Sequence, residues 1–516
     1  MTVAKWLSGV RNLKFRRPSQ KLRLPGGYPV SLLLGVVCVC FLQAPVQPNR
    51  QNETVVPEPV RLKPAQEGEA ESVNDETSEL SEQDDVKRSV AREFTGPLGL
   101  PYGIRGRVNL KYVGRWTEGA HDNDLYVHSS VDFGDSSRHL LSGHVSGRAA
   151  LDMDRNRRPN HPFRSIDDTY SKDVTGRLYS AYVDLNDVDG NPVRDVFERV
   201  RVGRQILYDT PETLFFDGVS LRSPSLEEAL DLRLMAFVGV PNHIFESSSS
   251  QDLTVGAAAE VMPWRGGQFR FDYMHVTDAY LGQTALDDLY GLSGSQRFGD
   301  LFLAAHMNFV ESDARDFGVQ AVFNLPDSGF SVTARYDGLL SDQKRNSIDF
   351  DFFTPVQATY FSYHQYSLFA HKGFGDQVFV DGGVQRRVLQ QDRNEGLFNH
   401  EFTRYYLTPG ISAWPLEGST LSLSAEFWDS GGDRFTAFGG DLTHEFDEQL
   451  SATLGTMFQL FRYDVLVDQE RQDVQVSYAR VDFHVSESCR VRAAFEYEDG
   501  DMDDFAKLTI GLRFDF

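Results

Sequence analysis

Apolar and polar side chains alternate with a period of two along most of this chain, from Ile104 to Phe516. In 104–116, apolar residues beginning at Ile104 alternate with basic or polar residues beginning at Arg105. The last segment, 506–516, keeps the same alternation up to its terminal aromatic residue. Because successive side chains of a strand point to opposite faces, each such segment predicts a strand with one apolar and one polar face.

The length of these segments indicates membrane-crossing strands. They run for about nine to eleven residues, which a tilted strand needs to cross a bilayer, whereas strands of soluble proteins average about five or six. We expect about 22 strands between residues 104 and 516, within a range of 16–24. A soluble propeller or solenoid is the alternative, but no repeat of about 40–50 residues is present to support it.

The connections between the segments favour a closed barrel. Every second connection is short, as in 325–329 and 444–449, and those between them are often longer. Short turns at one end and long loops at the other are typical of antiparallel transmembrane β-barrels. In a closed barrel the last strand pairs with the first, because lipid offers no partner for an unpaired edge. The longer connections are expected at 241–251, 277–287, 341–359, 389–401 and 464–473.

The front of the chain predicts export. Residues 1–50 hold eight Lys or Arg and no acid, and 30–43 is apolar, so 1–44 has the layout of a secretory signal peptide. An uncleaved anchor is the alternative. Residues 45–95 are rich in Glu, Asp, Ser and Pro and predict a disordered acidic periplasmic segment. The barrel is then expected to comprise 96–516.

The sequence offers little chemistry for catalysis. Removal of 1–44 would leave Cys489 as the single cysteine, which excludes an intramolecular disulfide and a thiolate metal cluster. Segment 152–157 begins like a calcium loop, but Arg157 replaces the required Gly. No phosphate-binding Gly loop and no nucleophile elbow is present. We therefore expect no enzymatic activity, no cofactor, no metal and no nucleic-acid partner.

The polar faces of the strands would line the bore and are expected to be mildly basic, although the chain has a net charge of −24. Arg residues in a pore favour anions, and a guanidinium binds a carboxylate with two parallel hydrogen bonds. The alternative is that the inward bases and acids only neutralise each other. The bases expected to line the lumen are Arg105, Arg107, Lys111, Arg115, Arg148, Arg199, Arg201, Arg233, Arg270, Arg335, Arg387, Arg404, Arg480, Arg490, Arg492, Lys507 and Arg513. The acids expected beside them are Asp132, Asp184, Asp231, Asp272, Asp337, Asp381, Glu426, Asp482, Glu496, Glu498 and Asp515.

The contact between the first and last strands should be the most basic part of this wall. The first strand carries four bases, from Arg105 to Arg115, and no acid on its polar face. Its expected neighbours offer Asp132 and His128 on one side and Asp515 on the other. Closure of the barrel should therefore leave a net positive stripe along the bore.

Two segments add a resemblance to known proteins. RVRVGRQILYDTPETLFFDGVSLR (199–222) resembles a segment of alginate-export-type porins, which are bacterial outer-membrane barrels with an Arg-rich bore. The terminal strand with Phe514 and Phe516 resembles the signature by which bacterial outer-membrane proteins are recognised for assembly. The residues that carry the first resemblance are Arg201, Gly203, Arg204, Gln205, Asp217 and Gly218.

These resemblances imply a location in the outer membrane of a Gram-negative-type bacterium, with membrane lipid and the barrel-assembly machinery as partners. The function expected first is a porin-like or export channel for anionic solutes, neutral solutes or polysaccharide. A structural sleeve that houses a partner protein, such as a redox conduit, is the second hypothesis. An outer-membrane hydrolase is the third.

Overall fold

The structure, a computed structural model, describes residues 93–95, 101–154, 163, 173–187, 196–208, 210–242, 252–280, 283–342, 361–391, 399–464, 469–500 and 504–516. The predicted signal peptide, 1–44, and the predicted acidic segment up to residue 92 lie outside these ranges. Glu93–Thr95, the last three residues of that segment, form a short strand, β1.

The described chain consists of β-strands and two short 3-10 helices. Among the described residues, no helix is both long enough and apolar enough to span a membrane. The strands are β1 Glu93–Thr95, β2 Pro101–Thr117, β3 Ala120–Phe133, β4 Leu141–Asp152, β5 Val174–Asn186, β6 Arg199–Leu207, β7 Leu214–Arg222, β8 Arg233–Pro241, β9 Leu253–Trp264, β10 Gly267–Tyr280, β11 Gln283–Phe298, β12 Leu301–Val310, β13 Asp313–Leu325, β14 Phe330–Leu339, β15 Tyr363–Phe374, β16 Val378–Leu389, β17 Phe402–Ser412, β18 Ser419–Ser430, β19 Asp433–Glu445, β20 Leu450–Asp464, β21 Gln469–Ser486, β22 Cys489–Asp499 and β23 Phe505–Asp515. The helices are η2 Glu227–Ala229 and η3 Pro326–Ser328.

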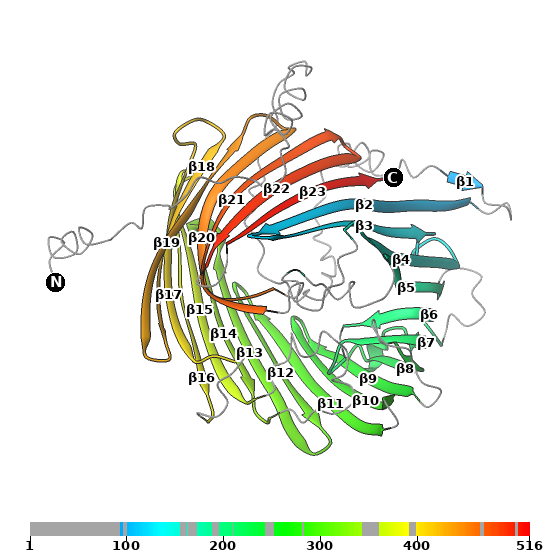
Figure 1. The fold of residues 1–516 in the computed structure, drawn as a ribbon. Coiled ribbons are helices and arrows are strands. Elements are labelled where there is room, and N and C mark those ends of the chain that lie inside the picture. The colour runs from blue at the N-terminus through cyan, green and yellow to red at the C-terminus, as the bar shows by residue number, and fades with distance from the viewer. Residues whose placement is uncertain are drawn as a thin grey trace, which may run out of the picture. The chain divides into compact units, whose positions relative to one another are not determined.

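Strands β2 to β23 form a closed antiparallel barrel of 22 strands, which confirms the predicted fold and strand number. The last strand pairs with the first from Arg107–Asp515 to Trp116–Ala506 (Figure 1). Gly106 and Phe516 extend this ladder with two backbone hydrogen bonds of 2.8 and 2.9 Å. Every strand in the barrel therefore has two neighbours, as lipid requires.

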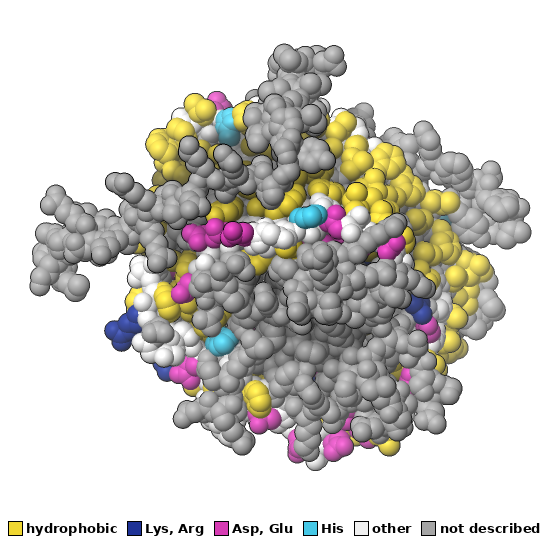
Figure 2. Space-filling view, in the orientation of Figure 1, with side chains coloured by type: hydrophobic (Ala, Val, Ile, Leu, Met, Phe, Trp, Pro, Cys, Tyr) yellow, Lys and Arg dark blue, Asp and Glu magenta, His cyan; other side chains and the backbone are white. Residues whose placement is uncertain are grey.

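The outer face of the barrel is apolar. Leu110, Leu512 and Phe495 are exposed, and they occupy alternate positions on strands whose other positions are polar. Figure 2 shows hydrophobic side chains as a yellow band over the outer flank. An exposed apolar band of this kind is stable in a bilayer, whereas monomeric soluble proteins rarely expose one.

The connections confirm part of the predicted alternation. We call the end that holds the short turns and Phe516 the turn end, and the opposite end the loop end. Long connections, such as 340–362 and 390–401, belong to the loop end, with 187–198 and 223–232 as the exceptions. The predicted loop at 277–287 is wrong, because β10 continues to Tyr280 and β11 begins at Gln283. Most of 464–473 is also strand, since β21 begins at Gln469.

Two hairpins leave the wall towards the loop end and turn into the bore. The β5–β6 ladder stops at Ala181–Arg204, although β6 continues to Leu207. The β19–β20 ladder stops at Gly440–Thr456, although β20 continues to Asp464. In Figure 1 an orange strand end of the β20–β21 hairpin points into the barrel. The bore is therefore narrowed by its own strands at the loop end.

An apolar cluster lies inside the barrel where the β6–β7 hairpin meets the wall. Its hairpin members are Leu207, Leu214 and Phe216, and its wall members come from β8, β10 and β11. In β10 the exposed residues Phe269 and Phe271 face outward, so the alternate positions face the bore. The wall members of the cluster are Phe237, Met274, Val276 and Leu289.

Candidate functional site

The strand register places the predicted lumen bases opposite the apolar face. Most of these bases alternate along their own strand with exposed apolar residues of the outer face, so they face the bore. The others lie opposite such an inward residue on the neighbouring strand. Asp231 differs from the prediction, because it lies in the β7–β8 turn and not on the wall. The bases on the inner face include Arg105, Arg107, Lys111, Arg115, Arg199, Arg201, Arg233, Arg270, Arg335, Arg404, Arg490, Arg492, Lys507 and Arg513.

Most of these bases are neutralised by a carboxylate next to them. Arg115 pairs with Asp122 and Asp124 of β3, and all three side chains are buried. The prediction that β3 offers only Asp132 and His128 is therefore wrong. Four further pairs on the wall are Arg201–Asp184, Arg270–Asp272, Arg335–Asp337 and Arg404–Glu426.

The wall is also more acidic than the sequence suggested. Register places several unpredicted acids on the inner face, because they lie opposite inward residues of the neighbouring strand. Their signal was present in the alternation, but Asp122, Asp124 and Asp152 stand near strand ends, where the pattern does not separate strand from loop. These acids are Asp122, Asp124, Asp152, Glu260, Asp287, Asp316 and Asp441.

A basic group remains where the barrel closes. Asp515 is shared by Arg107 and Arg513, at 2.7 Å from the Nε atom of each. Asp482 of β21 is shared by Arg490 and Arg492, at 2.8 and 2.7 Å. In both places two guanidinium groups share one carboxylate, so each place keeps a net positive charge.

Three of these guanidinium groups are open to the bore. The side chains of Arg107, Arg513 and Arg492 are 48%, 40% and 52% exposed. Within the described part of the chain, each uses its Nε atom alone for side-chain hydrogen bonds. The two terminal nitrogens of each group can therefore donate to an anion.

Gly511 lies at the centre of this basic group. It is paired with Arg492 on β22 and with Lys111 on β2. A Cβ atom at this glycine would meet only two backbone oxygens, at 3.9 and 4.0 Å, so the space above it is open. Lys111 is exposed and makes no ion pair with any described residue. We name Arg107, Lys111, Arg490, Arg492 and Arg513 the basic seam.

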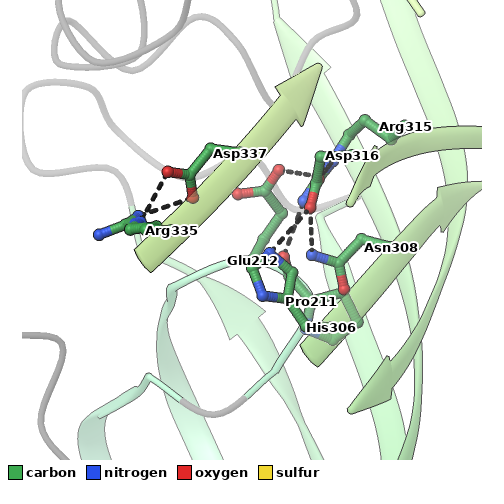
Figure 3. A network of polar contacts seen from close by, with 8 residues as sticks. All are labelled: Pro211, Glu212, His306, Asn308, Arg315, Asp316, Arg335 and Asp337. Atoms are coloured by element: carbon green, nitrogen blue, oxygen red, sulfur yellow. Dashed lines mark hydrogen bonds and ion pairs between the residues drawn. The ribbon is translucent and has the colours of Figure 1, made fainter. Parts of the chain in front are cut away.

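A second polar cluster fixes the β6–β7 hairpin in the bore (Figure 3). Arg315, the extra residue of a bulge in β13, is buried and donates from Nη2 to the Pro211 carbonyl oxygen at 2.9 Å. It also pairs with Glu212 and, from Nε at 2.6 Å, with Asp316. Asn308 donates to the same Asp316 carboxylate at 2.8 Å. The Arg315–Glu212 ion pair joins positions 103 residues apart, and no sequence signal indicated it.

The segment that carries the family resemblance is divided between the two faces. Arg201 pairs with Asp184 on the inner face. Gln205 is fully buried and accepts a 2.6 Å hydrogen bond from Ser220. Arg204 and Asp217, in contrast, form an ion pair on the outer face.

The predicted assembly residues lie at the turn end of β23. Phe514 and Phe516 are both exposed on the outer face, with their rings stacked at a centroid distance of 6.2 Å. Phe516 lies over Gly106, since a Cβ atom there would be 2.5 Å from its ring.

The chain was compared with known families, curated proteins and solved structures. No protein-family model and no curated protein matches it. The solved structures that are similar are barrels. The translocation pore of the P pilus usher PapC is 12% identical over 80% of this chain and 99% of its own, with a TM-score of 0.47. OccAB3 of Acinetobacter baumannii is 12% identical over 80% of this chain and 99% of its own, with a TM-score of 0.39.

OccK2 (OpdF) of Pseudomonas aeruginosa, in complex with glucuronate, is 10% identical over 80% of this chain and 98% of its own, with a TM-score of 0.38. At such identities the likeness is one of barrel fold and does not extend to a solute. The resemblance to alginate-export-type porins remains limited to residues 199–222.

Proposed function

We propose that this protein is an outer-membrane channel of a Gram-negative-type bacterium and that it passes anionic solutes along its bore. The barrel is closed, because each of its strands pairs with two neighbours, and its outer face is apolar. These are the two properties that a barrel needs in lipid. By the usual arrangement of such barrels, the turn end faces the periplasm and the loop end faces the exterior.

The basic seam is the observation that carries the choice of solute. Its guanidinium groups outnumber their carboxylates and are half-exposed to the bore. Walls of low dielectric constant concentrate such a field and raise the local concentration of counter-ions. A carboxylate passing Gly511 could accept hydrogen bonds from Arg492 on one side and Lys111 on the other.

Solutes with carboxylates on a sugar fit both the seam and the family resemblance. We propose uronates, free or as a polysaccharide chain, as the finer solute class. The inward hairpins favour a channel over a sleeve, because the β6–β7 hairpin already packs its apolar residues against the inside of the wall. A partner protein housed in the bore would have to displace this apolar cluster.

The selectivity of the seam gives the first prediction. Changing Lys111, Arg492 and Arg513 together to Gln should lower the anion preference of the pore, measured as the reversal potential in a KCl gradient. The effect should shrink as salt rises, because the screening length falls to about 10 Å at 0.1 M and 3 Å at 1 M. Arg386→Gln is the control, since Arg386 of β16 lies opposite the outward Tyr366 of β15 and therefore faces away from the bore.

Three outcomes decide the proposal. Anion preference that falls in the triple variant and is kept in the control supports it. Cation preference in the wild-type protein would show that acids of the loops or the wall dominate the pore. Absence of conductance in the wild-type protein would favour the sleeve.

A further inference from the structure

Aromatic side chains line one part of the bore. Strands β15 to β18 pair with one another in sequence and form a continuous part of the wall (Figure 1). On β17, Tyr405 and Leu407 are 51% and 53% exposed on the outer face. The alternate positions of this strand, which include Phe402 and Tyr406, therefore face the bore.

The strand register adds rings from the strands on both sides of β17. Trp428 of β18 and Phe379 of β16 lie opposite inward positions of β17. Phe369 of β15 lies two strands away from Tyr406 and at the same level. We name these rings the aromatic track; from the loop end to the turn end they are Phe402, Trp428, Tyr406 with Phe369, and Phe379.

The rings follow one another along the bore. Phe402 and Trp428 have a centroid distance of 5.4 Å, and Tyr406 and Phe369 one of 6.3 Å. From Phe402 to the level of Gly410, the track covers about 26 Å of strand, or about 20 Å along the bore at a tilt of ~40°. Such a row of rings is unexpected in a water-filled bore, where polar residues are usual.

Two of the rings lie against the wall because glycine stands beneath them. A Cβ atom at Gly410 would be 2.0 Å from the Phe379 ring, and one at Gly383 would be 2.7 Å from the Tyr406 ring. No side chain fits between these rings and the backbone, so the other face of each ring is turned to the bore. Both rings are partly exposed, as are those of Phe369 and Phe402, whereas Trp428 is buried and supports them.

Hydrogen-bonding groups stand among the rings. Arg404 donates to the Glu426 carboxylate at 3.0 and 2.6 Å, and Nε1 of Trp428 donates to the same carboxylate at 2.9 Å. Nearer the turn end, His371 pairs with Asp381 at 2.7 Å, and their side chains are 45% and 39% exposed. The track therefore offers ring faces next to groups that donate and accept hydrogen bonds.

The guanidinium group of Arg404 also holds the rings in place. Its Cζ atom lies 5.0 Å from the ring centroid of Tyr406 and 5.1 Å from that of Trp428. Cations attract the faces of aromatic rings at such distances. Because the same group is fixed by two hydrogen bonds to Glu426, the rings beside it are preorganised.

The loop end of the track adjoins the narrowed part of the bore. Phe461 belongs to the part of β20 that has left the β19 ladder. Its ring stacks on His400 with a centroid distance of 4.1 Å and an angle of 13°. His400 lies two residues before Phe402, so the β20–β21 hairpin contacts the wall beside the first ring of the track.

This combination of groups fits a sugar ring. A pyranose has faces of C–H groups, which pack on aromatic rings, and an edge of hydroxyl groups, which exchange hydrogen bonds with carboxylates and imidazoles. Ligand sites commonly join apolar and aromatic surface to a few placed polar groups in this way. An alkyl chain would use the rings but would cover the Asp381 carboxylate without replacing its hydrogen bonds, which costs free energy.

We propose that the aromatic track binds the sugar rings of an extended oligosaccharide, which moves through the bore from one ring to the next. The track recognises the faces of the sugar rings and takes neutral as well as acidic sugars, whereas the basic seam selects by charge. Strands β18 to β22 separate β17 from β23, so the two sites occupy different parts of the wall. The inference rests on the proposed channel function for the entry of the sugar.

Binding is tested by isothermal titration calorimetry of the full-length protein in a detergent that has no sugar head group. Cellobiose, cellotetraose and cellohexaose are the probes, and the affinity should rise with chain length because more sugar rings stack. Since these sugars are neutral, the affinity should be the same in 0.1 M and 1 M KCl, although the screening length falls from about 10 to about 3 Å. The titration needs neither conductance nor anion preference and is therefore independent of the test of the basic seam.

Substitutions of two rings locate the site. Phe369→Leu and Tyr406→Leu keep an apolar side chain and remove the ring face. Each should weaken cellohexaose binding by about two- to twelvefold, which corresponds to the loss of one aromatic contact. Tyr406→Phe keeps the ring and should bind as the wild-type protein does. Tyr405→Leu is the matched control, because it removes the neighbouring ring from the outer face.

Two results in the wild-type protein would overturn the proposal. One is the absence of cellohexaose binding, and the other is binding that is lost as salt rises, which would place the sugar at charged groups. Wild-type affinity in both Leu variants would show an apolar surface that needs no ring face, and so would exclude stacking of sugars. Equal weakening in Tyr405→Leu would place the binding site outside the track and would also contradict it.

Single-channel recording tests whether the bound sugar lies in the conducting path. Cellohexaose should block the KCl current, and Phe369→Leu and Tyr406→Leu should shorten the blocked times. Binding in the titration without any block of an open pore would overturn the movement of sugars along the track. Lack of any KCl conductance would count against the proposed channel, and the titration would still decide whether the track binds sugars.

Discussion

Deletion of Phe516 is expected to lower the amount of folded barrel in the membrane by at least about tenfold, a ratio that corresponds to only about 1.4 kcal/mol. Phe516 forms both backbone hydrogen bonds that extend the closing ladder to Gly106. Without it, the amide and carbonyl groups of Gly106 lose their partners beside lipid, where each unsatisfied group costs several kcal/mol. Replacement by Asp keeps the backbone bonds but places a charge on the apolar face.

The measurement is the level of heat-modifiable, folded protein in outer-membrane fractions, compared with total expression. Phe330→Leu is the control. Phe330 also lies at the turn end, where it starts β14, but it is far from the contact between the first and last strands. Phe516→Leu keeps the backbone bonds and tests the ring alone. Wild-type levels of folded protein after deletion would contradict the importance of the closing pair.

The barrel could be predicted from sequence because a closed sheet in lipid imposes the same two-residue period on every strand. Loop boundaries could not. The segment 277–287 has the polar composition of a loop, yet it continues the β10–β11 ladder, with Thr277 paired with Leu286. Above the bilayer a strand no longer needs an apolar face, so the alternation disappears while the backbone pairing continues.

The sequence contains a sign of the inward β6–β7 hairpin, namely apolar residues at positions that face the bore, but a search for regular alternation alone does not detect it. Phe216, Met274 and Leu289 are apolar at positions that face the bore, where a water-filled channel would favour polar residues. Their partners cannot be identified from sequence, because β6–β7 reaches across the strands between it and β13. The shared carboxylates of the seam were equally hidden, since each depends on the register of two neighbouring strands.

Replacement of Arg315 by Met is expected to release the β6–β7 hairpin and raise the conductance of the pore. The side chain of Arg315 is 10% exposed and joins the hairpin, through Pro211 and Glu212, to Asp316 of the wall. Breaking one partner of a buried ion pair costs about 3–5 kcal/mol, because the remaining charges lose their compensation. The ratio of docked to released hairpin should therefore fall by a factor of about 100 to about 4,000.

Single-channel recording should show this as new high-conductance states and increased open-channel noise. Arg335→Met is the matched control. Arg335 pairs with Asp337 of its own strand, β14, which is adjacent to β13, and among the described residues it makes no ion pair with the hairpin (Figure 3). Adding Glu212→Gln to Arg315→Met should restore part of the docking, because it removes the uncompensated carboxylate of the hairpin. Conductance and noise equal to wild type in Arg315→Met would mean that the apolar cluster of Leu207, Leu214 and Phe216 holds the hairpin without the ion pair.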